Sequence, residues 1–169
     1  MGYEAGKGGT TSEPFSSGVN NVAIGPAALT AFTTGNHNVA IGYQSAIALT
    51  TGDRNNFIGY HSGHDVTSGT NNTSLGHNSL SKITTTDEST AIGAQAFANR
   101  TVASGVAVGY QAGNAGSNGS ATYVGQQSGL YDASGTNNTG LGARSLYFNV
   151  NGSSNTAVGS LPLDRDWET

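Results

Sequence analysis

The sequence predicts an all-β protein, folded as a parallel β-solenoid of about nine coils of 16–17 residues, on three observations. An aliphatic residue is followed directly by glycine nine times in 169 residues, and these anchor glycines stand 16 or 17 residues apart. Small residues and turn-forming residues recur at fixed distances from them. Glycine, threonine and asparagine are dense enough to disfavour helix nearly everywhere. The nine pairs are Ile24-Gly25, Ile41-Gly42, Ile58-Gly59, Leu75-Gly76, Ile92-Gly93, Val108-Gly109, Val124-Gly125, Leu141-Gly142 and Val158-Gly159.

Each coil is expected to contain two short strands separated by two turns. Glycine stands seven residues before the anchor glycine in six coils, and asparagine stands four residues before it in six, so both positions predict turns with positive φ. The stretch that follows, such as Asn38–Ile41, is β-branched and alternating, which predicts a strand. Parallel coils about 4.8 Å apart would form a rod roughly 40 Å long. A second apolar row, seven residues after the anchor glycine, predicts the other strand: Phe32, Leu49, Val66 and Ile83.

Alternation along the first strand separates two rows of side chains. The residue before each anchor glycine, here the pre-glycine row, is always Ile, Leu or Val, and we expect this row to form the buried interior. The residue before that, here the small row, is expected to lie outside, where small side chains permit close approach of another subunit. The alternative is a solvated face of small residues. The small row is Ala23, Ala40, Phe57, Ser74, Ala91, Ala107, Tyr123, Gly140 and Ala157.

The composition limits the core and the partners. Charged residues make up 9% of the chain, against about 25% in an average soluble domain, and the aliphatic periodicity argues for an ordered, thin fold. Three or four apolar groups per coil bury too little surface for an isolated chain, so we expect association. A net charge of −4 gives no electrostatic basis for nucleic-acid binding. No apolar run is long enough to span a membrane, and without cysteine there is no disulfide or thiolate metal site.

The repeat resembles two related families. Residues 21–25 and 38–42, both Asn-Val-Ala-Ile-Gly, resemble the head repeats of trimeric autotransporter adhesins. The Thr-Thr-Gly that precedes the asparagine in some coils, and the Gly-Tyr-Gln runs at Gly42 and Gly109, resemble phage tail-fibre repeats. The resemblance covers about residues 18–160. It implies a left-handed parallel β-roll with three chains side by side, as part of an extracellular or virion fibre.

The expected organisation has three parts. Residues 1–17 are a truncated first repeat and a long loop, because residues 2–6 resemble residues 109–113. Residues 18–160 are the β-roll repeat domain. Residues 161–169, with the only tryptophan, are a cap or the start of a following domain. The first residues lack the features of a signal peptide. Residues 2–6 look like a repeat cut in its middle, so we expect a fragment of a longer chain.

The sequence contains no pattern typical of a catalytic site or a metal site. No pair of carboxylates has a spacing typical of general acid–base catalysis, so no catalytic or cofactor-binding residue is expected. The four histidines, His37, His61, His64 and His77, occupy different positions of the repeat, and no metal site is expected.

The residues expected to bind lie in the variable segments between strands. We expect a host cell-surface glycan or protein to contact Asp53, Arg54, Tyr60, His61 and His64. The tyrosines that follow an anchor glycine, among them Tyr43 and Tyr110, either stack on sugars or pack against the next coil or chain.

The resulting expectation is a non-enzymatic segment of a homotrimeric tail fibre outside the cell, acting as spacer and in host attachment. A bacterial surface trimeric adhesin head is the alternative. A second alternative is an ice-binding β-solenoid, because threonine pairs recur at residues 33–34, 50–51 and 84–86. A glycan-degrading fibre enzyme is disfavoured because no long insertion carries paired carboxylates.

Overall fold

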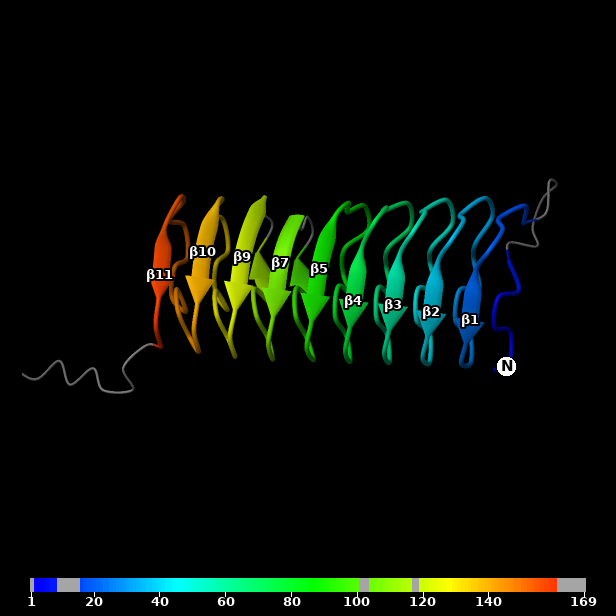
Figure 1. The fold of residues 1–169 in the computed structure, drawn as a ribbon, viewed down its shortest axis with the longest axis horizontal. Helices are drawn as coiled ribbons and strands as arrows, with labels where there is room; N and C mark the ends of the chain where they lie inside the picture. The colour runs from blue at the N-terminus through cyan, green and yellow to red at the C-terminus, as the bar shows by residue number, and fades with distance from the viewer. Residues whose placement is uncertain (1, 9–15, 101–103, 117–118, 161–169) are drawn as a thin grey trace, which may run out of the picture.

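The fold is a parallel β-solenoid, as the sequence predicts (Figure 1). The computed structural model describes residues 2–8, 16–100, 104–116 and 119–160, and none of these residues is helical. Nine strands lie side by side along the rod and all point the same way. They are β1 (Val22–Ile24), β2 (Val39–Ile41), β3 (Asn56–Ile58), β4 (Thr73–Leu75), β5 (Ser89–Ile92), β7 (Ser104–Val108), β9 (Ser120–Val124), β10 (Asn138–Leu141) and β11 (Thr156–Val158).

The strands pair strictly in sequence order, with the same repeat position always opposite itself. Ala23 aligns with Ala40, and Ala40 aligns with Phe57. The nine strands are joined through about eight turns of the solenoid. Coils are numbered here 1 to 9 by their anchor glycines. Residues 2–7 also stack on coil 1, since Gly6 donates to the Ala28 carbonyl and Ala27 donates to the Tyr3 carbonyl. The expected cap or following domain at residues 161–169 lies outside the described residues.

The second strand of each coil is mostly absent, which corrects the expectation of two strands per coil. Among the described residues only β6 (Asn99–Arg100) and β8 (Ala115–Gly116) form a second, two-stranded sheet. The residues two and four positions after the anchor glycine have positive φ in coils 1 to 8, as at Gln44 and Ala46 in coil 2. A tight turn therefore precedes the second row in every one of these coils, and it leaves at most a short extended run after it. The second apolar row is nevertheless buried, with Leu49, Val66 and Ile83 fully inside.

The predicted interior was assigned to the wrong face of the sheet. The pre-glycine row points outward: Ile24 is 51% exposed, Leu75 46% and Val158 76%, and the other members are half-exposed. The small row points inward, where Ala40, Phe57, Ala91, Ala107 and Tyr123 are fully buried. Alternation along the strand was predicted correctly, but the two faces were exchanged.

The narrow bore of the coil explains the exchange. The turn after each anchor glycine lies close against the inner face of the strand. In coil 2 the Ser45 hydroxyl donates to the Phe57 carbonyl at 2.9 Å, and in coil 7 the Ser128 hydroxyl donates to the Gly140 carbonyl at 3.0 Å. Small side chains fit between two walls this close, and the large Phe57 and Tyr123 fit because glycine stands opposite their rings. The small row does permit close approach of another backbone, but that backbone belongs to the same chain.

The anchor glycines are required for two reasons. Their φ angles lie between 117° and 141°, a region that L side chains rarely adopt. A Cβ at Gly42 would also lie 2.3 Å from the Gly59 carbonyl oxygen, and one at Gly59 would lie 2.5 Å from that of Gly76. The glycines seven residues earlier do not have positive φ, contrary to expectation. Those such as Gly35 are needed because a Cβ would strike the next coil.

The recurring asparagines also lack the expected positive φ and instead form a buried ladder. In coil 3 Asn55 donates from Nδ2 to the Gly69 carbonyl at 2.8 Å and to Asn38 Oδ1 at 3.0 Å. Its own Oδ1 accepts from the Asn72 amide at 3.0 Å. The residue just before the asparagine adopts the positive φ, as at Arg54. Each asparagine therefore fixes the spacing between two coils.

Candidate functional site

The outward face of the nine-stranded sheet carries a row of exposed aliphatic side chains along the described surface. It carries the pre-glycine row together with the first outward residue of each strand. None of these 18 positions, nine before the anchor glycines and nine two residues earlier, holds a charged residue. A soluble single chain rarely exposes a continuous apolar strip along its whole length, and such strips mark interaction surfaces. The earlier positions hold Val22, Val39, Asn56, Thr73, Thr90, Val106, Thr122, Thr139 and Thr156.

A second feature is a stack of rings just past the ends of β2, β3 and β4. The rings of Tyr43 and Tyr60 are stacked with centroids 5.3 Å apart, and those of Tyr60 and His77 are 5.2 Å apart. These residues directly follow the anchor glycines of coils 2, 3 and 4, so the coil spacing itself sets the stacking distance. Tyr43 is 44% and Tyr60 46% exposed. Tyr43 and Tyr60 therefore pack against a ring of the next coil, which is one of the two interpretations of these tyrosines.

His61 lies beside this stack. Its ring centroid is 4.0 Å from that of Tyr60 and 4.6 Å from that of His64. Its Nε2 is covered and has no hydrogen-bond partner among the described residues. Burial lowers the pKa of His61, and the neighbouring His64 and His77 lower it further, while Asp65 opposes them. A neutral His61 is therefore favoured near neutral pH.

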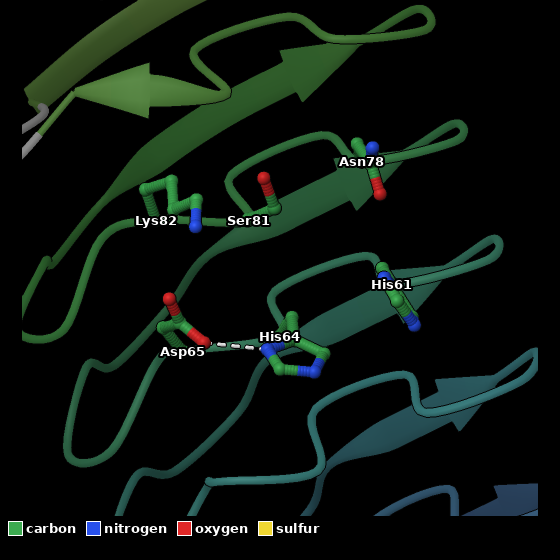
Figure 2. Close-up of a pocket in the computed structure, with 6 residues that line it drawn as sticks. All are labelled: His61, His64, Asp65, Asn78, Ser81 and Lys82. Carbon is green, nitrogen blue, oxygen red and sulfur yellow. Dashed lines mark hydrogen bonds and ion pairs between the residues drawn. The ribbon is translucent and has the colours of Figure 1, made fainter.

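A polar hollow of about 270 Å³ lies next to His61, between coils 3 and 4 (Figure 2). Coil 3 contributes His61, His64 and Asp65, and coil 4 contributes Asn78, Ser81 and Lys82. His64 Nδ1 is 2.5 Å from Asp65 Oδ1. Because a carboxylate only accepts, His64 donates this hydrogen bond from Nδ1 to Asp65.

The five predicted binding residues do not form one site. Tyr60, His61 and His64 lie together, as expected from their sequence spacing. Asp53 and Arg54 precede β3, at the opposite end of the strand from Tyr60. Asp53 Oδ1 accepts hydrogen bonds from the Asn36 amide at 2.6 Å and from Asn36 Nδ2 at 3.2 Å. Asp53 thus joins two coils.

Sequence reasoning missed most of the residues that complete the cluster. They stand at the same repeat positions as the predicted residues, one coil before or after, so the period itself was the signal. Tyr43 and His77 repeat the position of Tyr60. Asn78, Ser81 and Lys82 repeat the positions of His61, His64 and Asp65.

The buried charged side chains of the described residues, Arg100 and Asp132, lie in the second half of the rod. Arg100 is fully buried, with its guanidinium 4.8 Å from the centre of the Phe97 ring. The Tyr123 hydroxyl donates to Asp132, and both residues are fully buried. Burial and the Asp132 carboxylate raise the pKa of Tyr123. This network lies inside the coil and belongs to the core.

Threonine hydroxyls along the rod are used between coils. Thr33 Oγ1 donates to the Thr50 carbonyl at 3.1 Å, Thr50 Oγ1 to Thr67 at 2.9 Å, and Thr67 Oγ1 to Thr84 at 3.0 Å. Hydroxyls already bonded to the next coil are poorly placed to order ice, which weighs against the ice-binding alternative.

Two absences concern the residues that the structure describes. No group of three or more His, Cys, Asp or Glu side chains there could hold a metal ion. No helix in the same part of the chain is long and apolar enough to cross a membrane.

Comparison of the chain with family models, with curated proteins and with solved structures finds no match. The resemblance to adhesin heads and tail-fibre repeats therefore rests on the repeat residues alone.

Proposed function

We propose that this chain is a non-enzymatic structural segment of a homotrimeric extracellular fibre, a phage tail fibre, in which it acts as a rigid spacer and takes part in host attachment. The observation that carries the proposal is the outward face of the sheet, with its half-exposed pre-glycine row and no charge at 18 positions. Burying this row between chains adds the apolar contacts that a thin coil cannot supply alone.

The regular spacing of the aliphatic row matches a second copy of the same chain. The aliphatic side chains recur once per coil over all nine strands. A second copy of the same rod presents the same row with the same spacing, so every contact made at one coil repeats at the next. A partner of another fold would match only a few coils. That the assembly contains three chains is inferred from the resemblance to trimeric fibre repeats.

A bacterial surface trimeric adhesin head remains the alternative source, because the same resemblance and the same face support it. Both sources place the protein outside the cell, with the rod as a spacer. Neither requires a cofactor or a catalytic residue.

Light scattering of the purified chain tests the proposal. We expect a particle of three times the chain mass of 17.0 kDa at micromolar concentration. A monomer that stays folded by circular dichroism would contradict the proposal, because the pre-glycine row would then be stable in water.

A further inference from the structure

The hollow between coils 3 and 4 departs from the rest of the repeat. The three positions that line it, two, five and six residues after the anchor glycine, hold Gln44, Ile47 and Ala48 in coil 2. In coils 3 and 4 the same positions hold two imidazoles, a carboxylate, an amide, a hydroxyl and an ammonium group. Packing between coils does not require these groups, since coil 2 is built without them.

The hollow contains both hydrogen-bond donors and hydrogen-bond acceptors, and both a positively and a negatively charged side chain. Lys82 Nζ and Asn78 Nδ2 are donors, while the Asp65 carboxylate is an acceptor. Among the described residues no carboxylate lies within ion-pair distance of Lys82, since the ion pairs found there are Lys7–Glu4 and His64–Asp65. Figure 2 shows Asp65 and Lys82 at the same end of the hollow, one coil apart.

This pattern selects against simple ions. An anion that approached Lys82 would also meet Asp65, and a cation that approached Asp65 would also meet Lys82. A sugar hydroxyl both donates and accepts, so neighbouring hydroxyls of one ring can satisfy Asp65 and Lys82 together. The His61 ring adds an apolar surface at the other end, against the ring stack.

We propose that the hollow lined by His61, His64, Asp65, Asn78, Ser81 and Lys82 binds a neutral saccharide unit. The site deepens the attachment part of the proposed function and rests on it for its biological meaning. Its residues follow the ends of β3 and β4, so they lie outside the pre-glycine row.

Saturation-transfer NMR with methyl glycosides of glucose, galactose and mannose tests the site. We expect at least one neutral glycoside to bind weakly, on the order of millimolar. Lys82→Gln and Asp65→Asn should each weaken it by about tenfold, because each removes a charge-assisted hydrogen bond. Lys7→Gln, which changes a lysine far along the rod, is the control and should bind as the unmodified protein does. Methyl glucuronide and glucosamine should bind more weakly than the neutral sugar.

Either of two results would overturn the site: no neutral glycoside saturates, or Lys82→Gln and Asp65→Asn bind as strongly as the unmodified chain. Preference for glucuronide would also overturn it, because charge would then dominate recognition. Light scattering on the same samples separates this outcome from the proposed assembly. A trimer that binds no glycoside would contradict the saccharide site but not the proposed assembly. A monomer that binds a glycoside would contradict the assembly but not the site.

Discussion

The ring of Phe57 fills the space in front of Gly63: a Cβ at Gly63 would lie 2.4 Å from Phe57 Cδ1. One coil later the same two positions hold Ser74 and Leu80, both buried. Tyr123 and Gly129 repeat the first arrangement, with a Cβ at Gly129 only 2.4 Å from Tyr123 Cε1. Within these coils a large residue in the small row is matched by glycine six positions later, and a small one by leucine.

This exchange predicts a compensating pair of substitutions. Phe57→Ser should destabilise the protein by about 3–5 kcal/mol through the cavity it leaves. Gly63→Leu alone should cost about 1–3 kcal/mol by overpacking. The double variant reproduces coil 4 and should recover much of the loss, because Leu80 already adopts φ of 50°, close to the 62° of Gly63.

Urea unfolding of the four proteins measures the coupling between positions 57 and 63. If the losses of the two single variants simply add in the double variant, the volume compensation described here is wrong.

The buried asparagine ladder gives a second prediction. Asn55→Ala removes the bonds to the Gly69 carbonyl and to Asn38, and leaves the Asn72 amide without its acceptor. We expect a loss of at least about 2 kcal/mol in the free energy of unfolding. Asn151→Ala is the control, because Asn151 is exposed and accepts a bond only from Ser134 among the described residues. Equal unfolding midpoints for the two variants would show that the ladder adds no stability.

His61 gives a prediction about pH. Its folded-state pKa is lowered by burial and by His64 and His77, against the opposing charge of Asp65, while Tyr43 and Tyr60 cover the ring. The unfolded chain therefore binds the proton more readily, and stability falls as pH drops through the unfolded value of about 6.5.

His61→Gln should reduce this dependence, because glutamine stands at the same repeat position in coils 2, 5, 6 and 7. The measurement is the urea midpoint at pH 7.5 and at pH 5.0 for both proteins. The same fall in both would assign the pH dependence to other groups.

The regular spacing of the repeat made the fold and the strand positions predictable from the sequence. The choice of the inner face depends on contacts within each coil, which the spacing does not reveal. Nine anchor glycines at fixed spacing predicted the parallel solenoid and the strand positions. Alternation divides a strand into two faces but does not say which is inside, and residue size led to the wrong choice for Ile41 and Ala40. The correct choice depends on the position of the turn at Ser45, whose hydroxyl donates to the Phe57 carbonyl of the neighbouring strand.

The candidate site was predictable only in part for the same reason. Tyr60, His61 and His64 are near one another in sequence, so their proximity followed directly. Asp53 was expected at the surface site, but its bond to the Asn36 amide depends on the register between coils. Lys82 joins the hollow because 17 residues of chain return it to the position of Asp65, a contact that appears only when coils are stacked.

Assembly through the pre-glycine row is the central claim, and one pair of variants tests it most directly. Val124 and Val150 are exposed to similar extents, 38% and 46%, but only Val124 lies in the row. Light scattering and circular dichroism should show Val124→Asp as a dissociated or unstable chain, because a charge in the row would be buried unpaired between copies. Val150→Asp should keep three times the chain mass. If Val124→Asp remains a trimer as stable as Val150→Asp, the outward face of the sheet is not the interface.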